Sequence, residues 1–171
     1  MCGTTGGRLC ERELTNPDER HAEGTFQSVI DTNLKSVGLC MKYEIPQMLE
    51  QGSGAIVNTS SIAGLVGVPQ QPNLRGQQAR GLRIVQVGRP RVPDGGVRIN
   101  AVCPGLIDTP LMDRIYASNP ELNTEADNWQ PMERTGKLEE VAEAVIWLCS
   151  NKASFVVGHM MTVDRGLVAR G

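Results

Sequence analysis

Two short runs of apolar and β-branched residues place the strongest limit on what this chain can fold into. They are Ala55–Thr59 (Ala-Ile-Val-Asn-Thr) and Val97–Val102 (Val-Arg-Ile-Asn-Ala-Val). Strands with one solvated face alternate apolar and polar residues, whereas strands buried on both faces are mostly apolar. Met160–Val163 is a third short run of this kind. The sequence therefore predicts three buried strands in a parallel sheet.

Helical patterns precede the first and the last of these strands. Apolar residues recur at three- and four-residue steps from Phe26 to Leu49, and Pro46 is expected to kink that helix near its end. The same spacing recurs over Val141–Cys149, behind Glu139 and Glu140, whose charges suit a helix N-terminus. This order of elements indicates an α/β fold, a parallel sheet with flanking helices.

Three segments lack a clear pattern. Residues 1–25 are expected to form a loop, and Leu111–Thr135 is a polar stretch to which no element is assigned. Residues 74–93 hold five arginines and no acidic or aromatic residue. A nucleic-acid-binding role for these arginines is disfavoured, because no aromatic residue is interleaved for base stacking and the rest of the chain is slightly acidic.

Size and composition narrow the class of protein. A chain of 171 residues with a net charge of -2 suits one domain, residues 1–171, without nucleic-acid partners. No apolar run approaches the roughly 18 residues that a membrane span needs, and the N-terminus lacks an apolar signal core. Five scattered cysteines favour a reduced, cytoplasmic setting. His21 and His159 stand far apart, so no metal site is expected.

Four motifs in order resemble the classical short-chain dehydrogenases/reductases (SDR). They are Asp31-Thr32-Asn33, Ile56–Ser61 (Ile-Val-Asn-Thr-Ser-Ser), Asn100–Gly105 (Asn-Ala-Val-Cys-Pro-Gly) and Glu140-Val141-Ala142. Several motifs in register are far more specific than a lone glycine pattern. The resemblance, from about residue 25 to residue 171, implies a Rossmann-type domain that carries NAD or NADP at the C-terminal ends of its strands. It also implies hydride transfer involving a small-molecule carbonyl or alcohol.

The resemblance assigns roles to individual residues. Ser61 stands where the family's serine polarises the substrate carbonyl, and Asn33 where an asparagine holds a proton-relay water in a helix irregularity. The residues expected to meet the nicotinamide amide are Pro104, Gly105, Ile107 and Thr109. Plainer interpretations stay open: Ser61 as a strand-end serine bonded to local backbone, Asn33 as a buried amide, and Pro104-Gly105 as a simple turn.

One departure from the family pattern bears directly on catalysis. Leu74 and Gln78 occupy the positions of the family's active-site Tyr and Lys. That Tyr hydroxyl is the general acid or base, and its ordinary pKa of about 10 has to be lowered by the neighbouring cation. Leucine has no proton to give, so the sequence predicts impaired catalysis.

Two further departures concern the architecture of the domain. The strand, Gly-rich turn and helix with which the family begins have no counterpart in the sequence, which predicts a partial, N-terminally truncated domain with weakened cofactor binding. Its remaining strands are expected to present an unpaired edge and an uncovered apolar face. Arg165 interrupts a Val-Asp-Gly-Gly ending, with a bulky cation where glycine is expected.

A frameshift is one hypothesis for the unusual segment, residues 74–93. Residues 74–80 can be encoded as cta cgg ggc cag caa gca cgc, and reading one base later gives Tyr-Gly-Ala-Ser-Lys-His-Ala. Residues 87–93, encoded as gtc ggc cgc cct cga gta ccc, give Ser-Ala-Ala-Leu-Glu-Tyr in the shifted frame. The hypothesis is a pair of compensating frameshifts that ends before Val97.

Two alternatives to an impaired enzyme follow from the same features. One is a non-catalytic interaction module, a homo-oligomer or a partner of an intact relative, that pairs through the helix expected at Phe26–Leu49. The other is a product that does not fold stably.

Overall fold

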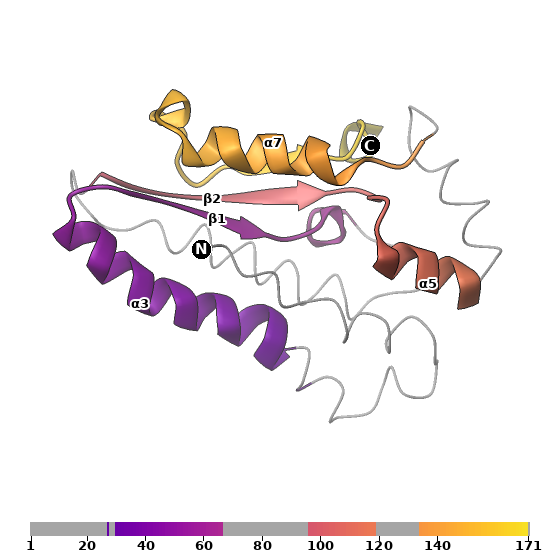
Figure 1. Ribbon diagram of the computed structural model, residues 1–171, viewed down its shortest axis with the longest axis horizontal. Helices are drawn as coiled ribbons and strands as arrows, with labels where there is room; N and C mark the ends of the chain where they lie inside the picture. Colours follow the sequence, from indigo (N-terminus) through magenta and orange to yellow (C-terminus); the bar gives the residue numbers. More distant parts are fainter. Residues whose placement is uncertain (1–26, 28–29, 67–95, 119–133, 171) are drawn as a thin grey trace.

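Three parallel strands form the sheet in the part of the chain that the structure describes, residues 27, 30–66, 96–118 and 134–170 (Figure 1). The computed structural model places β1 (Gly54–Thr59), β2 (Val97–Pro104) and β3 (Met160–Val163) in the order β1-β2-β3. Gly54 of β1 pairs with Val97, and Ala101 of β2 pairs with Met160. The three predicted parallel strands are confirmed.

One long helix covers each face of this sheet. α3 (Ser36–Glu50) lies on one side and α7 (Leu138–Cys149) on the other, as Figure 1 shows. The predicted α/β layering is therefore confirmed, and it is the arrangement of a Rossmann-like fold. α3 and α7 cover the two faces of β1 and β2, whereas no residue of β3 is fully buried, so the uncovered apolar face stays a prediction. Among the described strands β1 has a neighbour on one edge only, as expected for an unpaired edge.

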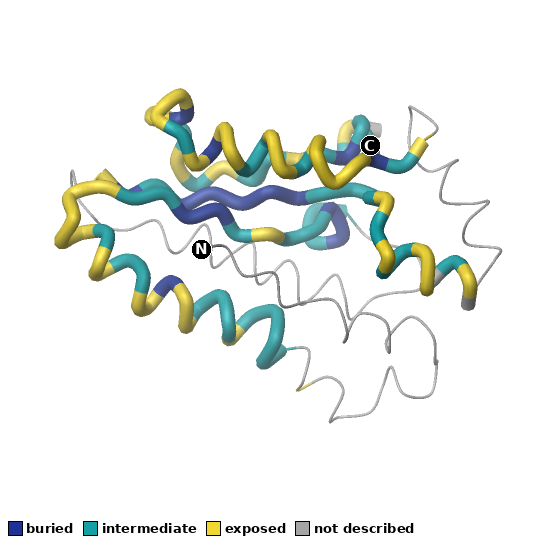
Figure 2. Tube along the Cα trace, viewed as in Figure 1, coloured by how far each residue is buried: buried dark blue, intermediate teal, exposed yellow. Residues whose placement is uncertain are grey.

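The core consists of two clusters, one beneath each helix, and their buried residues line the strands in Figure 2. The cluster beneath α3 comprises Met41, Ile56, Val97, Ile99, Ala101 and Cys103. The cluster beneath α7 comprises Val57, Val102 and Leu148. Successive side chains of a strand point to opposite faces, so neighbouring residues of β1 and β2 serve both clusters. Each large apolar side chain buried in this way stabilises the fold by about 1.5–3 kcal/mol.

The helix predicted at Phe26–Leu49 is present, with an irregularity near its start. A π-helical turn, η2 (Asp31–Lys35), runs directly into α3, which continues to Glu50. Pro46 lies inside α3. The chain then turns at Gly52, whose φ of 72° is a conformation that glycine adopts without strain.

Helix α5 (Pro110–Ser118) was not predicted, since sequence analysis described the stretch from Leu111 only as polar. Thr109 Oγ accepts a hydrogen bond from the Met112 N–H at 3.3 Å, as an N-cap residue does. Proline at the first helical position lacks only an N–H that would have no partner in the helix. The Thr109-Pro110 pair was therefore the signal for this helix in the sequence.

Three single-turn 3-10 helices, η3 (Ile62–Gly64), η4 (Asn151–Ala153) and η5 (Val168–Arg170), complete the described elements. No helix in the described ranges has the length and apolarity needed to cross a bilayer. The predictions for residues 1–25 and 74–93 lie outside the described residues.

Polar side chains of β2 tie the sheet to the C-terminal part of the chain. The Asn100 side chain is buried, donates to Val156 O at 2.9 Å and accepts from the His159 N–H at 3.0 Å. Arg98 donates to Leu148 O at 2.6 Å and to Ser150 O at 3.0 Å. These carbonyls lie at the C-terminal end of α7, where the helix has no further N–H groups to donate to them.

Candidate functional site

The carboxyl ends of the three parallel strands bring most of the predicted site residues to one edge of the sheet. The backbone N–H of Ser60, just after β1, donates to Val102 O at 2.9 Å. The N–H of Gly105, just after β2, donates to Val163 O at 3.0 Å. Ser61 and the segment from Pro104 to Thr109, called the cofactor segment below, thus share the edge at which Rossmann-type sheets bind ligands.

Ser61 caps the short helix η3. Its Oγ accepts a hydrogen bond from the Ala63 N–H at 3.2 Å, and the side chain is half-buried. This bond is the local backbone contact of the plainer interpretation. A hydroxyl also has one hydrogen to donate and a second lone pair, so the cap leaves Ser61 able to donate to a carbonyl oxygen.

Asn33 lies in the π-helical turn η2, at the helix irregularity expected of it. It is half-buried rather than fully buried, which does not match the plainer interpretation of a buried amide. In the same region the Ser36 hydroxyl donates to Thr32 O, four residues earlier. π-Turns occur in proteins mostly as single turns inside α-helices, and they are frequent at functional sites.

The cofactor segment is held by close backbone contacts. A Cβ on Gly105 would lie 3.0 Å from the Cα of Asp164, so a larger residue at position 105 would push the strands apart. Ile107 forms an isolated parallel bridge with Gly136. Thr109 caps α5 as described above, so its hydroxyl has a structural role besides any contact with a cofactor.

The segment after β3 is organised by a buried carboxylate. Asp164 accepts hydrogen bonds from the Gly166 N–H at 3.1 Å and from the Val168 N–H at 2.7 Å. Arg165, between Asp164 and Gly166, has a φ of 57°, the left-handed region that favours glycine. Arg165, where the family pattern has glycine, therefore occupies a backbone conformation that suits glycine. Burial, and to a smaller extent the charge of Asp164, raise the pKa of the Cys103 thiol to about 11.

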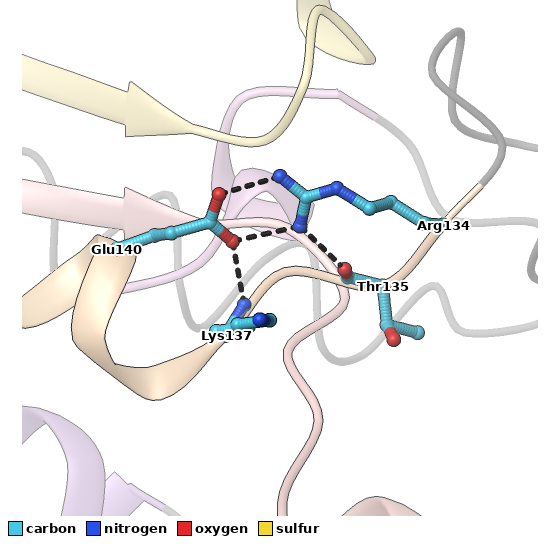
Figure 3. A network of polar contacts seen from close by, with 4 residues as sticks. All are labelled: Arg134, Thr135, Lys137 and Glu140. Carbon is cyan, nitrogen blue, oxygen red and sulfur yellow. Dashed lines mark hydrogen bonds and ion pairs between the residues drawn. The ribbon is translucent and has the colours of Figure 1, made fainter.

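A second polar group lies at the start of α7, and Figure 3 shows it from close by. Arg134 pairs with the Glu140 carboxylate through two hydrogen bonds, of 2.9 and 2.6 Å. The Lys137 N–H donates to the same carboxylate at 2.7 Å. The bonds from Arg134 first, and then that from Lys137, lower the pKa of Glu140 to about 2. Sequence analysis placed Glu140 correctly at a helix start but missed Arg134, six residues earlier.

Leu74 and Gln78 lie outside the described residues. Within the described ranges no cluster of three or more His, Cys, Asp or Glu side chains is arranged to hold a metal ion.

Comparison with known proteins decides the family. Residues 10–168 match the family described as "Enoyl-(Acyl carrier protein) reductase", a branch of the SDR proteins. The chain belongs to the short-chain dehydrogenase/reductase family. The resemblance inferred from four motifs is thereby confirmed.

Three curated SDR relatives illustrate the range of similarity. The chain is 36% identical over 145 residues to 2,5-dichloro-2,5-cyclohexadiene-1,4-diol dehydrogenase of Sphingobium indicum, covering 84% of this chain and 58% of the relative. It is 35% identical over 150 residues to a 3-oxoacyl-(acyl-carrier-protein) reductase of Thermotoga maritima, covering 87% and 59%. It is 38% identical over 152 residues to cyclohexanol dehydrogenase of an Acinetobacter species, covering 89% and 58%. The chain therefore spans less than two thirds of the length of these SDR enzymes.

Solved SDR structures share the fold. Levodione reductase aligns with a TM-score of 0.82 at 30% identity, over 92% of this chain and 63% of its own. ElxO with NADP bound aligns with a TM-score of 0.81 at 28% identity, over 88% and 61%.

Proposed function

We propose that this chain is an oxidoreductase by descent, built to bind NAD or NADP beside a small-molecule carbonyl or alcohol and catalytically impaired by Leu74 and Gln78. One observation carries the proposal. Ser61 follows β1 and the cofactor segment follows the neighbouring strand β2, so both lie at the carboxyl edge of the sheet. Curated relatives support the substrate class, since their names describe dehydrogenases of alcohols and reductases of a carbonyl. Solved relatives support the cofactor, since two of them contain NADP.

The described residues fit a nicotinamide cofactor at this edge. Pro104 ends β2 and Gly105 follows it, directly after Val102 and Cys103, which are fully buried and hold the start of the segment in the core. When bound, the cofactor supplies or accepts the hydride. Ser61 donates a hydrogen bond to the carbonyl oxygen, which favours the charge that develops there. Asn33, in the π-turn η2, holds a water that carries protons toward the site.

The missing step is proton transfer. Hydride transfer to a carbonyl leaves an alkoxide that needs a proton, and neither leucine nor glutamine has a group that exchanges one near neutrality. General acid-base catalysis contributes about 10²- to 10⁴-fold to rate. We therefore expect cofactor binding with turnover lower than that of intact relatives by about this factor.

Two measurements test the proposal together. NADH or NADPH should quench the fluorescence of the chain, to which the partly exposed Trp147 contributes, while reduction of a cyclic ketone stays slow. Turnover at a rate normal for the family, from a chain verified by intact mass, would overturn the assigned impairment. The absence of any quenching or calorimetric signal with both cofactors would overturn the cofactor assignment.

A second candidate function is a non-catalytic pairing module. Leu39 and Tyr43 are 44% and 69% exposed and lie four residues apart on α3, so they share one face of the helix. Such apolar exposure suits a helix-helix contact with a second copy or an intact relative. Light scattering should then give a dimer mass that falls to the monomer mass in Tyr43→Glu, whereas Glu44→Gln on the same helix keeps it. A monomer in the unaltered chain, and no complex with a purified intact relative, would exclude this function.

A further inference from the structure

The cofactor segment is fastened to the turn that leads into α7. The Gly136 N–H donates to Leu106 O at 2.9 Å, and the Asp108 N–H donates to Gly136 O at 2.8 Å. The two bonds flank Ile107 and form its bridge with Gly136. Because these backbone bonds lie on both sides of Ile107, they fix its position relative to Gly136.

Gly136 approaches the segment closely enough that its own position matters. It is buried, and a Cβ at this residue would lie 2.6 Å from the Cδ1 of Ile107. A small shift of the turn is therefore transmitted to the segment rather than absorbed by an intervening space.

The Glu140 carboxylate closes the turn around Gly136. It accepts two bonds from Arg134, before Gly136, and one from the Lys137 N–H, directly after it (Figure 3). Arg134 also donates to Thr135 O at 3.0 Å, so its guanidinium is anchored to the turn itself. The carboxylate thus fixes the backbone on both sides of the bridging glycine.

Because this ion pair is partly exposed, its effect on the position of the turn can be distinguished from its effect on the stability of the domain. The side chains of Arg134 and Glu140 are 45% and 40% exposed, and exposed ion pairs contribute little to the free energy of unfolding. Two parallel bonds between a guanidinium and a carboxylate nevertheless impose a definite geometry. Losing the pair should therefore shift the turn far more than it destabilises the domain.

We propose that Arg134 and Glu140 are a positioning pair, which holds Ile107–Thr109 in place for the nicotinamide amide by fixing Gly136. This rests on the proposed cofactor role of the segment. Neither side chain contacts the cofactor itself, and both act through the backbone of the turn.

The test compares three variants of the full 171-residue chain. Glu140→Ala removes all three bonds, Glu140→Gln keeps an oxygen that accepts from Lys137 N–H, and Glu139→Ala removes a neighbouring acid of the same helical turn as a control. Hydrogen exchange of the Asp108 amide reports on the bridge. Calorimetric titration with NADH and with NADPH reports on the site, and thermal unfolding reports on stability.

In Glu140→Ala we expect the Asp108 amide to exchange about tenfold faster and the Kd for the cofactor to rise about tenfold, with little change in Tm. Glu140→Gln should fall between this variant and the unaltered chain, and Glu139→Ala should match the unaltered chain. Unchanged Asp108 exchange in Glu140→Ala, or equal losses in Glu139→Ala, would overturn the proposal. Were the unaltered chain to bind neither cofactor, the proposed function would fail, while the exchange rates would still decide whether the pair holds the segment.

Discussion

Asn100 shows how one buried polar residue fixes the relation between distant parts of the chain. Both polar atoms of its amide are used, one toward Val156 and one toward His159. Removing one partner of a buried hydrogen bond leaves the other without a substitute, which costs more than the bond itself is worth.

Asn100→Leu is therefore expected to be strongly destabilising. The leucine leaves Val156 O and the His159 N–H without their partner, and the free energy of unfolding should fall by about 2–4 kcal/mol. Urea denaturation followed by circular dichroism measures the loss. The control is Asn58→Ala, because the Asn58 amide donates to the Met41 sulfur, a weak acceptor, at 3.6 Å. Equal losses in the two variants would show that the pairing of the Asn100 amide is not what matters.

Cys103 is expected to resist alkylation. Burial raises the pKa of its thiol to about 11, so little thiolate is present at pH 8, whereas Cys40 and Cys149 are exposed. Iodoacetamide at pH 8 should modify the two exposed cysteines well before Cys103, as read by peptide mass spectrometry. Raising the pH toward 11 in the folded state should narrow the difference. Equal labelling of the three at pH 8 would mean that the β2 core opens readily.

At the scale of elements, Arg98 joins β2 to the end of α7. The guanidinium donates to Leu148 O and Ser150 O, so a strand residue caps a helix that lies across the sheet. A positive charge at a helix C-terminus is also favoured by the helix dipole.

Arg98→Met keeps much of the apolar stem and removes both donors. We expect the free energy of unfolding to fall by about 1–3 kcal/mol, because the two carbonyls lose charged partners. Lys152→Met, in the exposed turn after α7, removes a charge near the same helix end and should change stability by less than about 0.5 kcal/mol. Chemical denaturation of both variants decides between a specific cap and a general effect of charge.

Element type was predictable wherever apolar spacing was strong, and the misses have physical causes. β1, β2 and α7 followed from local patterns, because burial on a sheet or beneath a helix leaves a periodic trace. α5 was missed although Leu111, Met112 and Ile115 stand at helical spacing, because its nine residues were read as part of a polar stretch. The Thr109 cap at its start had already been assigned to the cofactor by the family resemblance. The ion pair of Arg134 and Glu140 leaves no periodic trace, since it joins a loop to a helix.

The candidate site was predictable only in part. The carboxyl edge followed from parallel strands, and Ser61 and Gly105 from the motifs around them. The local backbone contact of Ser61 was one of the interpretations left open, whereas the cap that Thr109 forms on α5 was not foreseen, because a cap depends on backbone angles that sequence does not state.

At the scale of the whole molecule, the frameshift hypothesis makes the boldest prediction. The gene should recover Tyr and Lys when residues 74–80 are read one base later, and resequencing decides this directly. Replacing these residues by Tyr-Gly-Ala-Ser-Lys-His-Ala, which includes Leu74→Tyr and Gln78→Lys, should raise ketone turnover by about 10²-fold or more. The control replacement carries phenylalanine at position 74 and should leave turnover low. Equal activity of the two replacements would remove the assigned role of the hydroxyl.

The strands of this sheet also determine how the chain reaches its native state. β1, β2 and β3 come from residues near 54, 97 and 160, and the bonds of Asn100 and Arg98 reach 50 to 59 residues along the chain. Contacts between such distant segments form only after large loops have closed, and the entropy of closure is lost before any bond is gained. We therefore expect folding to be slower than that of a helical bundle of equal size, so that the unpaired strands stay exposed to proteolysis for longer.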